Sequence, residues 1–143
     1  MMYSVTRQHE IACGHRVHGH ESKCAHLHGH NYLCHLTCEP ASESDMLDSL
    51  GRVIDFGVIK RLLCEWLERN WDHRFLIWEK DPAADYLVKI DPKVVIVPFN
   101  PTAENMAAYL VREVGPLVFA GTGVVLSQVV IEETRKCSAT FTL

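Results

Sequence analysis

The sequence has no long apolar run. Nowhere do eighteen apolar residues follow one another, so a membrane-spanning helix is not expected. The first ten residues also lack the apolar stretch of a secretory signal peptide, and we therefore expect a cytoplasmic protein. The sequence contains no internal repeat and no low-complexity tract, which argues against a repeat architecture or a disordered chain.

Positive charge is also scarce. The 14 Lys and Arg residues stand against 18 Asp and Glu residues, and the net charge of −4 lacks the surplus typical of nucleic-acid-binding proteins. DNA and RNA are therefore not expected as partners. A Gly-rich phosphate loop is absent too, so any phosphate contacts must come from scattered basic residues, of which Arg16 and Lys23 are candidates.

The composition that remains is that of a soluble globular protein. The 143 residues are 48% hydrophobic, which predicts one domain, residues 1–143, with a packed core. In the cytoplasm the six cysteines are expected to be reduced, and most of them to be small core residues.

Alternating and helical patterns predict an α+β fold. Residues 3–12, 31–38, 124–134 and 138–143 are typical of strands. Asp55 is expected to cap one helix with apolar residues at three- and four-residue spacing, from Phe56 to Leu67, and Asn100-Pro101 to open a second. The segment 77–99 is broken by two Asp-Pro pairs and predicts an irregular excursion with one small strand.

These elements predict a four-stranded antiparallel sheet with both helices on one face. The other face and the sheet edges then need a partner, so we expect self-association into a larger sheet or a barrel.

The most informative segment lies between Cys24 and His30. His28 and His30 point to the same face of an extended chain and can bind one metal ion together, with imidazole and thiolate being ligands that Zn²⁺ prefers. The intervening Gly29 allows another backbone or a ligand to approach closely.

The third metal ligand is open from the pattern alone, the candidates being His15, His18, His20, Cys24 and His26. An extended row from Cys24 to His30 would span roughly 20 Å, too far for all of its side chains to reach one ion without a bend. His15, at the end of the first strand, could meet the pair across an antiparallel ladder. Three His ligands would leave a position open for substrate, whereas addition of Cys24 would close the site and make it structural.

Five motifs occur in one order along the chain: His15-Arg16 followed by Cys24-x-x-x-His28-Gly29-His30-Asn31-Tyr32, then Gly51-Arg52-Val53-Ile54-Asp55-Phe56, Asp72-His73, Asn100-Pro101-Thr102-Ala103-Glu104-Asn105, and Glu132-Glu133-Thr134. Together they resemble the 6-pyruvoyl-tetrahydropterin synthase superfamily. The three-residue gap between Cys24 and His28 resembles its bacterial 6-carboxy-tetrahydropterin synthases of queuosine (7-deazapurine) biosynthesis. Trp71, where members usually have Leu, and the long excursion 77–99 depart from the family pattern.

The resemblance implies the tunnelling fold, subunits joined into a barrel as a trimer stacked on a trimer, and Zn²⁺ held by His15, His28 and His30. It also implies a zinc-dependent lyase that converts 7,8-dihydroneopterin triphosphate to 6-carboxy-5,6,7,8-tetrahydropterin, releasing acetaldehyde and triphosphate. The alternatives are the 6-pyruvoyl product, formed without side-chain cleavage, and a pterin-binding zinc protein that has no turnover.

Four further residues have roles in that interpretation. Cys24 is the expected general base, which removes a carbon-bound proton. Asp72 is expected to orient His73, which relays a proton. Glu133 is expected to accept hydrogen bonds from the ring N–H and amino groups of the pterin.

Overall fold

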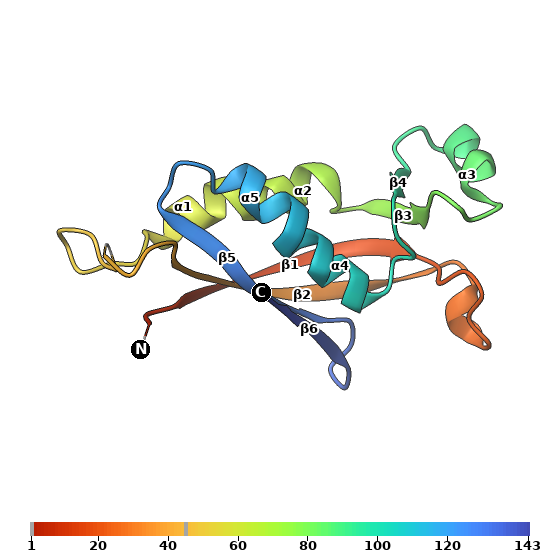
Figure 1. The fold of residues 1–143 in the computed structure, drawn as a ribbon. Coiled ribbons are helices and arrows are strands. Elements are labelled where there is room, and N and C mark those ends of the chain that lie inside the picture. The colour runs from red at the N-terminus through yellow and green to blue at the C-terminus, as the bar shows by residue number, and fades with distance from the viewer. Residues whose placement is uncertain (1, 45) are drawn as a thin grey trace.

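A computed structural model describes residues 2–44 and 46–143. Its six strands form one curved sheet in the order β4-β3-β1-β2-β5-β6 (Figure 1). The strands are β1 (Val5–His15), β2 (His28–Pro40), β3 (Arg74–Trp78), β4 (Val95–Val97), β5 (Val124–Glu132) and β6 (Ser138–Thr142). The four strands expected from the sequence, β1, β2, β5 and β6, are present and pair in an antiparallel manner.

The sheet is nevertheless not the four-stranded antiparallel sheet that the sequence predicts. Two short strands, β3 and β4, extend it beyond β1 in parallel pairings, so the sheet is mixed. They come from the segment expected to be mostly irregular, which folds as β3, helix α3 (Ala84–Ile90) and β4. The helix provides the crossover that parallel neighbours require.

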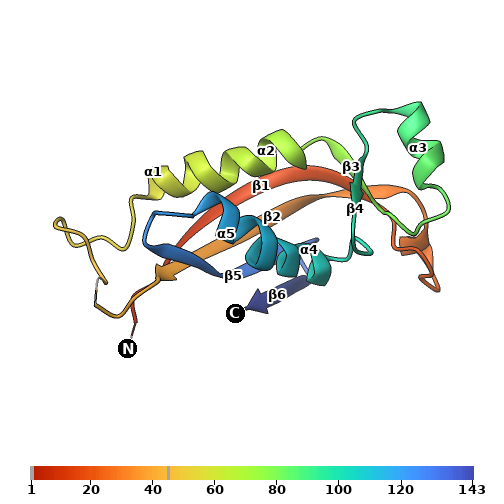
Figure 2. The same ribbon diagram turned by 45° about the horizontal axis from the view of Figure 1, so that its top comes forward.

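Two long helical segments cover one sheet face, as predicted. The first contains α1 (Phe56–Ile59) and α2 (Glu65–Asn70), joined by a π-helical segment (Lys60–Cys64). The second contains α4 (Ala103–Tyr109) and α5 (Gly115–Val118), joined by another (Leu110–Val114). Figures 1 and 2 show both on the same side of the sheet, and within the described residues no helix lies over the other side.

The capping residues were predicted correctly for one of these helices. Asp55 accepts a hydrogen bond from the backbone N–H of Gly57, as expected. The second helix begins later than predicted, because Thr102, not Asn100, caps it by accepting from the N–H of Asn105. Asn100 instead bonds with both backbone groups of His18, and so connects the start of α4 to the loop after β1.

The core lies between the helices and one sheet face. Strand residues alternate, with Ile11, Cys13 and His15 of β1 buried on the same side as Tyr32 and Cys34 of β2. Trp71, the residue that departs from the family pattern, is buried in this core. Phe56, expected in the buried stripe, is instead 51% exposed at the start of α1.

The cysteines also fit the expectation. All six thiols are free, and Cys13, Cys34, Cys38 and Cys64 are buried. Within residues 2–44 and 46–143, none of the helices is both long and apolar enough to cross a membrane.

Candidate metal centre

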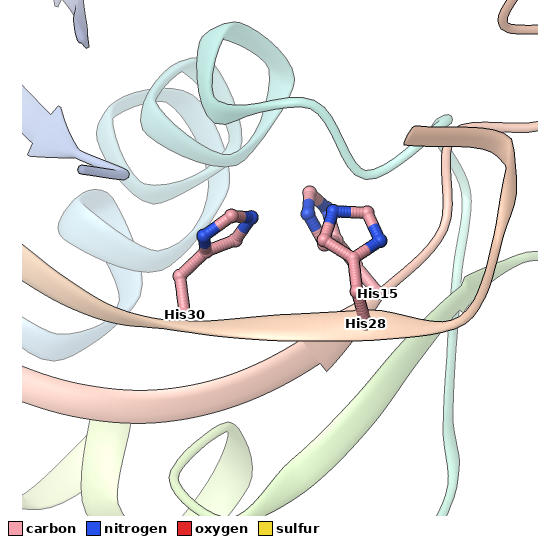
Figure 3. A group of neighbouring side chains, drawn as sticks. All are labelled: His15, His28 and His30. Atoms are coloured by element: carbon pink, nitrogen blue, oxygen red, sulfur yellow. The ribbon is translucent and has the colours of Figure 1, made fainter. Parts of the chain in front are cut away.

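Three histidines meet at the end of the β1–β2 ladder. His15 lies directly opposite His28, and Cys13 opposite His30, so the three imidazoles project from neighbouring strands to the helix-covered face. Figure 3 shows the ring of His30 facing those of His15 and His28. One ring nitrogen from each residue lies within 4.8 Å of the other two. The structure thus brings together the set that the family resemblance implies.

Two glycines allow this close pairing of strands. Gly14 lies opposite Gly29, one position from the metal-site histidines. A Cβ atom on Gly29 would lie 2.9 Å from the Cys13 carbonyl oxygen, so a side chain there would collide with the neighbouring backbone. A Cβ atom on Gly14 would lie 2.6 Å from the ring of Phe75. The close backbone approach expected at Gly29 is therefore confirmed.

Backbone carbonyls orient two of the imidazoles. His15 donates its Nδ1–H to the carbonyl oxygen of Pro101, 2.6 Å away, and His28 donates to that of His26 at 2.7 Å. These bonds leave the Nε2 atoms as the nitrogens that can bind a metal, an arrangement typical of metal-bound histidines. The sequence pattern did not reveal the role of Pro101, because a carbonyl group carries no residue-specific signal.

The electrostatics favour neutral imidazoles. Burial lowers the pKa of His15, although the Pro101 carbonyl opposes this shift, and burial also lowers the pKa of His30, where Glu133 opposes it. A neutral ring can donate its lone pair to a metal. The Nε2 atoms of His15 and His30 are buried and have no hydrogen-bond partner, which is costly unless an ion or another group binds there. The three residues therefore fit a metal ion.

The other predicted site residues lie at different distances from this centre. Glu133 follows β5 on the same sheet face, with Oε1 3.4 Å from His15 Nε2 and 3.6 Å from His30 Nε2. Cys24 lies in a short 3₁₀ turn (Lys23–Ala25), outside the set of ligand atoms within 4.8 Å of one another. The turn bends the chain before His28, so Cys24 does not continue the extended row of His28 and His30.

Asp72 and His73 form the predicted pair, but at another place. The His73 Nδ1–H donates to Asp72 Oδ2 at 2.9 Å, and Asp72 Oδ1 accepts from the backbone N–H of Ala12. His73 lines an open surface depression of about 600 Å³ with Ala12, Asn31 and Phe75, and Cys13 and His30, whose side-chain positions alternate with those of Ala12 and Asn31 along the ladder, border it too. The pair and the three histidines therefore lie on opposite faces of the sheet.

The burial of Asp72 is offset by its hydrogen bonds. Desolvation raises the pKa of its carboxyl group, but the bonds from Ala12 and His73 outweigh this, and the pKa is lowered overall. Asp72 is thus ionised at neutral pH and can hold His73 in one orientation.

Arg16 is committed to an ion pair that the sequence did not predict. Its guanidinium group binds both carboxylate oxygens of the buried Asp81, with Nε 2.6 Å from Oδ2. The pair joins the residue after His15 to the turn before α3, and both views show this helix at the same end of the molecule as the loop after β1 (Figures 1 and 2). Arg16 is therefore a positioning group in this structure, and its proposed phosphate contact has no support here.

Known proteins share the sequence and the fold of this chain. Residues 4–143 match the family described as 6-pyruvoyl tetrahydropterin synthase. A protein of Rickettsia felis named 6-carboxy-5,6,7,8-tetrahydropterin synthase is 36% identical over 138 residues, covering 95% of this chain and 97% of that protein. A probable 6-carboxy-5,6,7,8-tetrahydropterin synthase of Halobacterium salinarum is 34% identical over 105 residues, or 72% of this chain and 63% of that protein.

Solved structures share the fold. An uncharacterized protein of Wolinella succinogenes superposes with a TM-score of 0.83 at 23% identity, covering 99% of this chain and 98% of that chain. The 6-pyruvoyl tetrahydropterin synthase of Caenorhabditis elegans gives a TM-score of 0.68 at 24% identity, covering 100% and 96% of the two chains. From its sequence match over nearly the whole length, the chain belongs to the 6-pyruvoyl tetrahydropterin synthase family.

Proposed function

We propose that this protein is a zinc-dependent lyase that converts 7,8-dihydroneopterin triphosphate and water to 6-carboxy-5,6,7,8-tetrahydropterin, acetaldehyde and triphosphate, in 7-deazaguanine (queuosine) biosynthesis. The observation that carries the proposal is the convergence of His15, His28 and His30, two of them with buried Nε2 atoms that lack a partner. The relatives named 6-carboxy-5,6,7,8-tetrahydropterin synthase, which match 95% of the chain, support the choice of reaction.

The donor set favours zinc. Three imidazoles without a fixed fourth ligand are typical of catalytic zinc sites. A bound zinc ion would supply Lewis-acid chemistry, lowering the pKa of the hydroxyl groups on the pterin side chain and stabilising negative charge on oxygen.

Protein side chains would move the protons. Cys24 would remove a carbon-bound proton from the substrate side chain. His73 would return or relay a proton through Nε2, because Nδ1 is bonded to Asp72. The side chain of His73 is 81% exposed, so this nitrogen is accessible to a ligand.

The opposite locations of the two groups favour an assembly. Within one chain, the sheet separates the Asp72-His73 pair from the three histidines and Glu133, which share the helix-covered face. Both groups can act on one substrate if a second copy contributes the pair. The uncovered sheet face and the edge strands β4 and β6 would be used in the same association. We therefore propose a homo-oligomeric barrel, a trimer stacked on a trimer.

A product assay tests the reaction. Purified, zinc-loaded protein is incubated with 7,8-dihydroneopterin triphosphate, and the products are identified by mass spectrometry. We expect acetaldehyde and the 6-carboxylated pterin in equal amounts, and neither from a His28→Ala control. Absence of both products from the loaded protein would refute the proposal.

The name of the matched family favours a second candidate, the 6-pyruvoyl reaction. In that reaction triphosphate leaves and the side chain stays whole. The same assay would then release triphosphate without acetaldehyde, which separates the two activities.

A further inference from the structure

The carboxylate of Glu133 points at two of the three metal-site histidines. Its Oε1 atom lies 3.4 Å from His15 Nε2 and 3.6 Å from His30 Nε2. Neither nitrogen has a hydrogen-bond partner, and both are buried. The carboxylate therefore lies beside the two buried nitrogens that a bound ion would satisfy.

These separations match those expected between ligands of one zinc ion. With Zn–N and Zn–O bonds of about 2.0–2.2 Å, two vertices of a tetrahedron lie roughly 3.3–3.6 Å apart. Both distances from Glu133 fall in this range. His28 lies farther from Glu133, outside ion-pair contact. To complete the coordination shell, either the carboxylate must turn toward His28 or His28 must turn toward the carboxylate.

The chain around Glu133 permits this movement. Its backbone N–H donates to the carbonyl of Cys137 at 3.0 Å, which anchors the main chain in a turn between β5 and β6. Its side chain is 26% exposed and makes no hydrogen bond to another described side chain beyond the two histidine contacts. The tip of Glu133 can thus turn while its backbone stays in place.

Cys24 does not compete for this position in the structure. Its thiol makes no ion-pair or hydrogen-bond contact with the three histidines in the described part of the chain, whereas Glu133 contacts two of them.

We propose that Glu133 is a displaceable fourth ligand of the metal, which closes the coordination shell in the absence of substrate. An oxygen atom of the pterin side chain then replaces it, and the released carboxylate accepts the N–H groups of the pterin ring.

The first part of this proposal does not depend on the lyase reaction, and the second part rests on the proposed function. As a fourth ligand, Glu133 would slow the loss of the metal when the site holds no substrate. It would also couple metal exposure to pterin binding, since one carboxylate cannot occupy both positions.

The first experiment measures zinc affinity with no pterin present, by competition with a chromophoric chelator. We expect Glu133→Gln to weaken zinc binding by at least about tenfold, the loss typical of groups that support a metal site. The matched control is Glu132→Gln, because Glu132 is the neighbouring carboxylate on the opposite sheet face, where it pairs with His35. The control should bind zinc as the native protein does.

The second measurement is the visible absorption of the Co²⁺-substituted protein, which reports the number and type of ligands. The native protein and Glu132→Gln should share one spectrum, and Glu133→Gln should differ. Glu133→Asp keeps the charge but withdraws the oxygen by one methylene, so its spectrum should resemble that of Glu133→Gln. Native affinity and a native spectrum in Glu133→Gln would overturn the proposal.

Displacement is tested by adding 7,8-dihydroneopterin, which lacks the triphosphate leaving group. The Co²⁺ spectrum of the native protein should change on addition, and an unchanged spectrum at saturating pterin would contradict displacement. Failure of the product assay with a positive metal result would instead refute the proposed reaction alone. The two proposals can therefore fail separately.

Discussion

His73 donates its Nδ1–H to the carboxylate of its own neighbour, Asp72, across 2.9 Å. The backbone of His73 has φ of 58°, in the left-handed region that side-chain-bearing residues rarely adopt. Such a conformation costs about 1–3 kcal/mol and persists where the surroundings enforce it, often at functional sites. Here the backbone N–H of His73 bonds to the carbonyl of Ala12 at 2.6 Å, which holds the conformation.

This strain gives a test that separates function from structure. In His73→Gly the backbone conformation is no longer strained, although glycine raises the entropy of the unfolded chain, so we expect the free energy of unfolding to stay within about 1 kcal/mol of native. Product formation should fall by about 100-fold or more, because the proton relay is lost. Urea unfolding and turnover measurements check the two parts. A stable variant with native turnover would show that His73 is not catalytic.

The metal centre predicts a specific loss of zinc. His28→Ala removes one of three imidazoles at a partly exposed position, so the protein should fold but purify with little zinc, as measured by mass spectrometry. His26→Ala is the matched control, because His26 contributes only its backbone carbonyl to the orientation of His28. The control should keep its zinc. Equal zinc contents in the two variants would exclude His28 as a ligand.

The ion pair between Arg16 and Asp81 predicts a pH dependence of stability. The hydrogen bond from Arg16 lowers the pKa of Asp81 below its ordinary value of 3.8. Because the folded-state pKa is the lower one, the pair stabilises the fold above the unfolded pKa, and this stabilisation is lost as the pH falls through the folded pKa. The unfolding free energy should thus decline as the pH drops below about 4.

Replacement of the buried partner should remove this contribution. Asp81→Asn leaves the Arg16 charge without its partner and should cost about 3 kcal/mol at neutral pH, with a shallower decline in acid. Asp85→Asn, an exposed position in the first turn of the following helix α3, should change stability by less than about 0.5 kcal/mol. Parallel acid profiles for Asp81→Asn and the native protein would contradict the role assigned to this pair.

The sequence pattern was sufficient for the elements with clear periodicity. Apolar residues alternate along β1 and β2, and they recur at helical spacing from Ile59 to Leu67, so these strands and this helix were predicted. The pair His28 and His30 pointed to the candidate metal centre, because a strand projects residues two apart to one face. The pattern left the third ligand open and the family resemblance implied His15, which the ladder register places opposite His28.

Other features depend on tertiary contacts that no local pattern contains. Strands β3 and β4 are short, and their parallel pairing is with segments distant in sequence. Asn100 and Thr102 are both good capping residues. Thr102 caps the helix because the side chain of Asn100 is hydrogen-bonded to the backbone of His18. The left-handed backbone of His73 and its bond to the Ala12 carbonyl are likewise tertiary features that the pair Asp72-His73 does not reveal in the sequence.

The zinc content of Cys24→Ala tests the central claim most directly, because the claim is that three histidines hold the metal and leave Cys24 free for chemistry. The account predicts that this variant purifies with as much zinc as the native protein and unfolds at the same denaturant concentration, while formation of the carboxylated pterin is abolished. Loss of zinc and of stability in Cys24→Ala would contradict it, since the thiol would then be a structural ligand.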